Sequence, residues 1–170
     1  MMVKAVRVML EPNNVQQTKM FQYAGAARFA YNWALAKEKD NYEKGGKFIS
    51  DSELRKEFTR LRNSAEYAWL QNVSNNVTKQ AIKDACIAYK NFFKSLQKYP
   101  KFKSKKKSTP KFYQDNIKIQ FSDTHVKFEG FSSSRKANKQ KLNWVRLAEH
   151  GRIPTDAKYM NPRISFDGLN

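Results

Sequence analysis

The residues of this sequence best suited to chemistry are lysines interleaved with aromatic rings, a pattern that favours binding of a polyanion. Residues 98–111 read KYPKFKSKKKSTPK. Lysines neutralise phosphates and release counterions, and aromatic faces can stack on nucleobases. The alternative is a solvated hinge in which Phe102 and Phe112 cover the core beneath it. The candidate nucleic-acid-binding residues of this stretch are Lys98, Tyr99, Lys101, Phe102, Lys103, Lys105, Lys106, Lys107 and Lys111.

A second candidate surface is one face of a predicted helix that begins near Ser74 and runs to about Lys98. The candidate residues on this face are Asn76, Lys79, Gln80 and Lys83. Asn and Gln can pair bidentately with adenine, and Lys reaches guanine or phosphate. Their spacing would aim side chains into a groove from a single helix. An ordinary solvated helix face is the simpler interpretation, because every helix at a protein surface has a polar side.

Catalysis has little support in the sequence. His125 and His150 lack metal-ligand spacing, and the single cysteine, Cys86, excludes an internal disulfide and a cysteine-based zinc site. The acidic residues are scattered. Three of them could meet in space, although turn positions explain each better: Asp123, Asp156 and Asp167. We therefore predict no catalytic residue, no metal ligand and no cofactor.

Composition bounds the class of protein. The 33 Lys and Arg against 15 Asp and Glu leave a net charge of +18, which a polyanion partner would offset. Nucleic acid is the usual polyanion, and an anionic membrane surface is the competing one. Hydrophobic residues make up 40% of the 170 residues, too many for a disordered basic tail. No stretch approaches the roughly 20 apolar residues that span a bilayer, and the first residues do not form a secretion signal. We expect a soluble protein of a reducing, cytoplasmic compartment.

The elements that would position these residues change character along the chain. Residues 3–10 alternate and predict a strand. A helix is predicted over about residues 15–39, with a buried stripe of Met20, Ala24, Ala27, Tyr31 and Leu35. Ser50 and Glu53 have capping-box spacing before a short helix that carries Leu54, Phe58 and Leu61 on one face. Within the first helix, the run from Phe29 to Trp33 holds three aromatic residues that cannot all face the core.

After the lysine-rich stretch the pattern has period two. Short strands are predicted around residues 117–121, 126–128, 144–147 and 163–166. The fold class is therefore α+β, with a strand, then at least three helices, then further strands.

The ordered motifs resemble the amino-terminal part of the TnpB (OrfB) family, transposon-encoded proteins related to the type V CRISPR effector nucleases. The resemblance rests on KAVRVMLEPN at the start, RFAYNWALA at residues 28–36, WLQNVSNNVTKQAIKDACIAYKNFFK at residues 69–94, and YPKFKSKKK at residues 99–107. LNWVRLAEHGRIP at residues 142–154 is a weaker match. Together these stretches span nearly the whole chain.

The resemblance implies a small β-barrel, the wedge domain, with a helical recognition domain inserted after its first strand. The expected division is a first wedge strand in residues 1–14, a helix-turn-helix-like recognition domain in 15–97, a lysine-rich connector in 98–111 and the rest of the wedge barrel in 112–170. It also implies a guide RNA and a short duplex DNA motif as partners, with the four polar residues of the third helix approaching that motif. The chain ends where the family would enter its RuvC nuclease domain, so the aspartate, glutamate and zinc cysteines of the nuclease half have no counterpart here. The leading hypothesis is a bacterial, archaeal or phage-encoded binding module that does not cut by itself.

Two hypotheses from other classes stay open. One is a stand-alone sequence-specific DNA-binding repressor or transposition regulator that kept the scaffold without catalysis. The other is a metal-dependent nuclease or transposase that uses the scattered acidic residues. The DNA motif, the RNA and the oligomeric state are not readable from the sequence.

Overall fold

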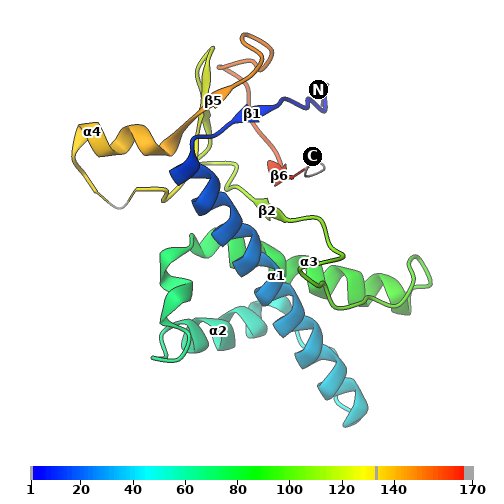
Figure 1. Ribbon diagram of the computed structural model, residues 1–170. Helices are drawn as coiled ribbons and strands as arrows, with labels where there is room; N and C mark the ends of the chain where they lie inside the picture. Colours follow the sequence, from blue (N-terminus) through cyan, green and yellow to red (C-terminus); the bar gives the residue numbers. More distant parts are fainter. Residues whose placement is uncertain (1, 133, 167–170) are drawn as a thin grey trace. The chain divides into compact units, whose positions relative to one another are not determined.

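A computed structural model describes residues 2–132 and 134–166 (Figure 1). These residues form two compact units. Unit 1 comprises residues 1–20 and 114–162, and unit 2 comprises residues 21–113 and 163–170. The helix α1 runs through the boundary at residue 20. The regular elements, in chain order, are β1 (Leu10–Glu11), α1 (Asn14–Glu43), α2 (Asp51–Arg62), η1 (Ala68–Asn72), α3 (Asn75–Phe93), β2 (Lys111–Tyr113), β3 (Gln120–Phe121), β4 (His125–Lys127), α4 (Ala137–Gln140), η2 (Lys141–Asn143), β5 (Trp144–Leu147) and β6 (Arg163–Ser165).

The core of unit 2 lies among its three long helices. The predicted stripe along the first helix is buried, with no member of the stripe more than 8% exposed. From α2 come Leu54 and Phe58, which are 0% and 2% exposed. From α3 come Val77, Ala81, Ala85 and Tyr89, which recur every four residues and are all buried. The helical period of the sequence is therefore confirmed for all three helices.

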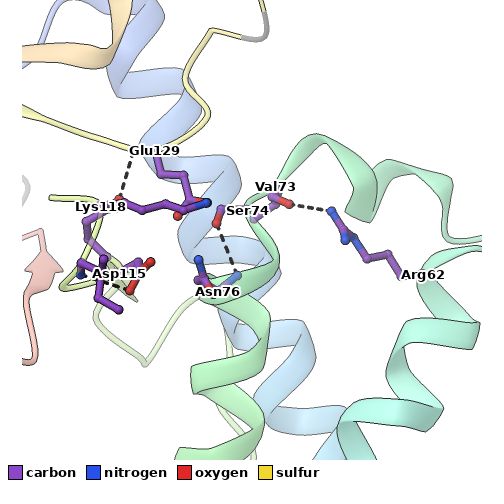
Figure 2. Close-up of polar contacts among 9 residues, drawn as sticks. Arg62, Val73, Ser74, Asn76, Asp115, Lys118 and Glu129 are labelled. Carbon is purple, nitrogen blue, oxygen red and sulfur yellow. Dashed lines mark hydrogen bonds and ion pairs between the residues drawn. The ribbon is translucent and has the colours of Figure 1, made fainter.

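Short polar contacts fix where α2 and α3 begin. The Ser50 side chain accepts a hydrogen bond from the Glu53 amide at 3.2 Å, which confirms the predicted cap of α2. The Ser74 side chain accepts from the Asn76 amide at 3.3 Å and caps α3 (Figure 2). Between these helices the Arg62 guanidinium donates to the carbonyls of Leu70 and Val73, the second at 3.1 Å (Figure 2). These bonds satisfy backbone groups of the turn that joins the two helices.

The third helix ends at Phe93, five residues before the predicted end at Lys98. Ser95 adopts a left-handed backbone with a φ of 58°. The amide of Leu96 then donates back to the Asn91 carbonyl at 2.9 Å. A left-handed residue followed by such a bond closes a helix, so the turn at Ser95 sets the boundary.

Unit 1 is built on an open four-stranded antiparallel sheet in the order β1-β5-β4-β3. Leu10 pairs with Leu147, and Val126 pairs with Val145. The fold class α+β is confirmed. Within the described ranges the strands do not close into a barrel, because β1 and β3 each have one neighbour. The core of this sheet contains Ile119, Val126, Phe128, Phe131, Val145 and Leu147, all buried.

Two predicted strands are much shorter than expected. The alternation over residues 3–10 yields a strand only at Leu10–Glu11, since only these residues pair with β5. Residues 117–121 yield only β3, because the Asp115 side chain accepts from the Ile117 amide at 3.3 Å and begins a turn there. Ile117 consequently stays 85% exposed, and only Ile119 of the two isoleucines is buried.

A buried glutamine fastens the start of α1 to the sheet of unit 1. Gln16 is 4% exposed, and its side-chain amide donates to the carbonyls of Leu142 and Trp144 at 3.0 and 2.8 Å. Its own amide donates to the Asn13 side chain at 2.9 Å, and its side-chain oxygen accepts from the Asn13 amide. This reciprocal pair caps α1 in the manner of a capping box, although the sequence did not single it out.

The two-stranded sheet of β2 and β6 lies in unit 2 and pairs Phe112 with Ile164. Strand β2 was not predicted, because its residues fall at the end of the lysine-rich stretch.

Of the helices in the described part of the chain, none is long and apolar enough to cross a membrane.

Candidate nucleic-acid interface

An asparagine of α1 fixes the lysine connector, residues 98–111, at its midpoint. The Asn32 side-chain oxygen accepts from the Lys103 amide at 2.8 Å, and its side-chain nitrogen donates to the Lys103 carbonyl at 2.7 Å. A side-chain carboxamide that bonds both the backbone amide and the backbone carbonyl of one residue makes the same pair of hydrogen bonds as a neighbouring strand would. The connector is therefore held against α1 at one residue and is not a free hinge.

The next residues form a turn that presents three lysines. The Ser104 carbonyl and hydroxyl accept from the amides of Ser108 and Lys107 at 3.0 and 3.1 Å. The Ser108 hydroxyl accepts in return from the Ser104 amide at 3.1 Å. The turn lysines, Lys105, Lys106 and Lys107, are all exposed. Adjacent cations that make no ion pair with a carboxylate within the described residues are well suited to phosphate groups.

Beside this turn lies a small cavity of about 70 Å³ lined by several cations. The Nζ of Lys103 lies 4.0 Å from the centroid of the Tyr31 ring. Burial lowers the pKa of Lys103, and the nearby Lys111 and Arg163 lower it further, while Asp84 opposes them. A lysine whose protonation is opposed by neighbouring cations lies in a positive potential that a bound anion would relieve. The cationic residues that line the cavity are Arg28, Lys103, Lys111 and Arg163.

Asp84 organises the other side of the cavity. Its carboxylate accepts two hydrogen bonds from the Arg163 guanidinium at 2.7 and 3.1 Å. It also accepts from the Gln80 side-chain amide at 3.0 Å. Bidentate Arg–carboxylate geometry is directional, so Arg163 is held in place. Gln80 is held too, with its carbonyl oxygen as the atom still able to accept from a ligand.

The four predicted residues of the third helix, the α3 polar face, have different surroundings. Lys79 and Lys83 are exposed, whereas Asn76 and Gln80 are half-buried. The amide of Asn76 is part of the helix cap. All four lie on one helix, and Gln80 joins the network around Asp84.

Two aromatic rings in the first half of the connector lie against a lysine of α1. The Nζ of Lys39 is 4.8 Å from the Tyr99 centroid and 4.4 Å from that of Phe102. Lys98 and Lys101 are exposed. The core-covering interpretation is correct for Phe112, which is 2% exposed, and wrong for Phe102, which is 52% exposed.

The aromatic run of α1 is used inside unit 2. The Phe29 ring lies 5.6 Å from Tyr67 and 5.4 Å from Trp69, and Trp33 lies 5.1 Å from Phe58. No motif or spacing in the sequence singled out Arg28, Asn32, Lys39, Asp84 or Arg163 as site residues. A polar Asn32 between two aromatic residues was the available signal.

No group of three or more His, Cys, Asp and Glu that could hold a metal ion occurs among residues 2–132 and 134–166. His125 contacts the Thr124 hydroxyl through Nδ1 at 2.7 Å. Of the three acidic residues of the nuclease hypothesis, Asp167 lies outside the described residues, and Asp123 and Asp156 belong to unit 1.

Comparisons with known proteins agree with the resemblance. Residues 1–47 match the family model of the OrfB/IS605 helix-turn-helix domain. Two relatives are named as putative RNA-guided DNA endonucleases. InsQ of Escherichia coli (strain K12) is 28% identical over 143 residues, which cover 84% of this chain and 36% of InsQ. The protein of Streptomyces pristinaespiralis is 29% identical over 105 residues, or 62% of this chain and 26% of that protein.

A third relative is short. Virulence protein VsdF of Salmonella dublin is 27% identical over 113 residues, which cover 61% of this chain and 95% of VsdF. The matched regions thus span about a third or less of the two named endonucleases but nearly all of VsdF. The chain is a distant, partial-length homologue of the TnpB-like RNA-guided endonucleases and carries an OrfB/IS605-type helix-turn-helix region at its N-terminus.

Proposed function

We propose that this chain is a nucleic-acid-binding module that holds a guide RNA and recognises a short motif in duplex DNA. The observation that carries the proposal is the convergence of Arg28, Lys103, Lys111 and Arg163 on one cavity beside the exposed turn lysines. The Asn32 bonds hold the backbone of Lys103, one of these cations, in place before any ligand arrives. Preorganised cations lose less side-chain and backbone entropy on binding.

We propose further that the two kinds of contact are divided within unit 2. The connector lysines would bind the phosphate backbone, which gives affinity without sequence preference. The α3 polar face would approach the DNA motif, with Gln80 reading a base edge because Asp84 fixes its amide. Residues 1–14 and 112–170 would then correspond to the wedge part of the family and residues 15–97 to its recognition domain.

The first test is the salt dependence of binding. Replacement of Lys105, Lys106 and Lys107 by Gln should reduce the slope of log K against log salt by roughly 2 to 3 between about 50 and 200 mM, because each phosphate contact contributes about 0.7 to 0.9. The matched control replaces three exposed lysines of unit 1, Lys136, Lys139 and Lys141, by Gln. An equal effect of both triple replacements would show a diffuse charge effect and contradict the proposed interface.

The second test concerns the guide RNA and the DNA motif. The chain is expressed beside its native flanking DNA, and the nucleic acid that copurifies with it is sequenced. One discrete RNA from the flank supports guide binding, and mixed RNA of every origin contradicts it. Gln80→Ala should lower the preference for one duplex motif over scrambled duplex by about tenfold while non-specific affinity stays unchanged.

The match over nearly all of VsdF favours a second candidate, a binding protein that acts without a nuclease. This candidate predicts a discrete footprint on one duplex site with no RNA present. Both candidates predict that the chain alone does not cut DNA. Mg²⁺-dependent nicking abolished by Asp123→Asn would contradict both and support the metal-dependent nuclease.

A further inference from the structure

A cluster of seven aromatic rings lies where α1, α3 and the lysine connector meet in unit 2. Six of the rings contact one another in pairs, two of which, Tyr42–Phe93 and Phe48–Tyr89, join residues far apart in the sequence. The Phe93 centroid lies 5.3 Å from Tyr42 and 5.1 Å from Tyr89, and the Phe92 centroid lies 4.8 Å from Tyr99. Phe48 stacks on Tyr89 at 6.5 Å with an interplanar angle of 21°. The members of this aromatic cluster are Tyr42, Phe48, Tyr89, Phe92, Phe93, Tyr99 and, through the shared cation Lys39, Phe102.

Most of the aromatic cluster is on the surface. Tyr89 is 2% exposed and forms the buried base. Five of the other rings keep more than a third of their surface in solvent: Tyr42 59%, Phe48 37%, Phe93 50%, Tyr99 42% and Phe102 52%. Neighbouring large apolar side chains at a surface are costly, and a contiguous exposed patch indicates a binding site.

Cations are held at the faces of these rings. Lys39 lies over both Tyr99 and Phe102, and the Nζ of Lys90 lies 4.8 Å from the Phe48 centroid. Further exposed lysines flank the rings in the chain: Lys44, Lys47, Lys94, Lys98 and Lys101. Of the acidic residues beside them, Asp40 already pairs with Lys44 at 2.9 Å. Exposed aromatic side chains together with excess positive charge complement a ligand that has both flat apolar rings and negative charge.

We propose that the aromatic cluster binds unpaired nucleotides of single-stranded nucleic acid by stacking their bases on its exposed rings. Bases within a duplex already stack on one another and offer only their edges in the grooves, so flat rings can reach them only in a single strand. The flanking lysines would neutralise the phosphates between stacked bases. This site deepens the proposed function, on which it rests, and it differs from the α3 polar face, whose residues occupy the first half of that helix.

The experiment compares binding of a fluorescent single strand of about 12 nucleotides with that of a duplex of the same length, using the whole chain. Phe93→Ala and Phe102→Ala should each weaken single-strand binding by about tenfold and leave duplex binding within about twofold. Phe93→Leu keeps the apolar bulk but not the ring and should weaken single-strand binding like Phe93→Ala. The matched control is Ile87→Ala. Ile87 is an apolar residue of the same helix that is 45% exposed, and its replacement should change neither affinity. Circular dichroism confirms that each variant is folded.

A single strand that carries 2-aminopurine reports stacking directly, because stacking quenches its fluorescence. Quenching by the wild-type chain that Phe93→Ala and Phe102→Ala reduce is the expected result. Unchanged single-strand affinity and quenching in both variants would overturn the proposal. So would self-association of the chain that Phe93→Ala abolishes while single-strand binding persists, which would make the cluster a protein interface.

The same measurements separate this proposal from the proposed function. If stacking fails but the Lys105, Lys106 and Lys107 replacements still reduce the salt slope on duplex, only the aromatic site is refuted. If those lysines have no more effect than their control while base quenching persists, the proposed interface is refuted and the aromatic site stands.

Discussion

The buried carboxyl of Glu38 should make the helical unit more stable at mildly acidic pH than at alkaline pH. Glu38 lies in the last third of α1 and is 1% exposed. Neither carboxylate oxygen has a hydrogen-bond partner of good geometry among the described residues, although the Ile49 backbone lies close enough to interact with the carboxyl group. Burial raises the pKa of Glu38 from 4.5 to about 7, against smaller lowering effects of the Ile49 backbone and Lys90. The nearby Cys86 thiol has its pKa raised to about 12, mainly by burial and secondarily by Glu38.

The sign follows from proton binding in the two states. Between pH 4.5 and about pH 7 the folded chain keeps the Glu38 proton and the unfolded chain has lost it. Stability therefore falls as pH rises through this window and levels off above about pH 7. The difference between the two pKa values corresponds to about 3 kcal/mol in the free energy of unfolding, because a tenfold change in proton affinity is worth about 1.4 kcal/mol.

The variant Glu38→Gln tests this prediction, because glutamine keeps the shape of the side chain and cannot carry the negative charge. Urea unfolding followed by circular dichroism gives the free energy of unfolding from about pH 5 to pH 8 at constant ionic strength. From about pH 5 to pH 8, the free energy of unfolding of the variant should rise relative to that of the wild-type chain by up to about 3 kcal/mol. The matched control is Glu43→Gln, an exposed glutamate on the same helix, whose difference from wild type should stay flat. If the difference in the free energy of unfolding between wild type and Glu38→Gln does not change with pH, the Glu38 carboxyl does not titrate with a raised pKa in the folded chain.

Three further predictions concern single contacts. Ser50→Ala should lower the free energy of unfolding by about 1 kcal/mol through loss of the α2 cap, whereas Ser52→Ala on the exposed first turn should change it little, as thermal unfolding will show. Gln16→Leu leaves two carbonyls of unit 1 without their donor and should cost about 2 to 3 kcal/mol in urea unfolding; an unchanged midpoint would show that water replaces the amide. Asn32→Ala should speed hydrogen exchange of the Lys103 amide by about tenfold or more and expose the connector to trypsin, with the helices still protected; a connector as resistant as the wild type would contradict the clamp.

The helices were predictable because each carries its own periodic signal. Met20, Tyr31 and Leu35 recur at helical spacing. Ser50, three residues before Glu53, has the capping-box spacing that predicts the start of α2. These signals are local, so the sequence alone reveals them. The early end of α3 was not predicted, because a serine at positive φ is uncommon and leaves no pattern in the sequence.

The strands were harder to predict because a strand exists only where a partner pairs with it. Residues 3–10 alternate as a strand would, yet only Leu10–Glu11 find β5. Strand β2 looks like part of a lysine-rich loop and becomes a strand by pairing with β6, about 50 residues later in the chain. For the candidate site, the lysines were visible from composition. The Asn32 bonds and the Asp84 network were not, since they join residues 71 and 79 positions apart.

The pairing of β2 with β6 also bears on how this chain can change over time. Tyr113 and Arg163 are direct partners in the ladder, so the segment between them begins and ends at neighbouring positions. Strand partners lie only about 5 Å apart, a distance that one tight turn can bridge. Lengthening a segment with fixed ends costs little entropy, about 0.6 kcal/mol for each doubling. Extra residues placed directly after Tyr113 or before Arg163 would therefore add little entropic cost while β2 and β6 keep their pairing, whereas the rest of residues 114–162 is tied to β1 and Gln16 by the contacts of β5.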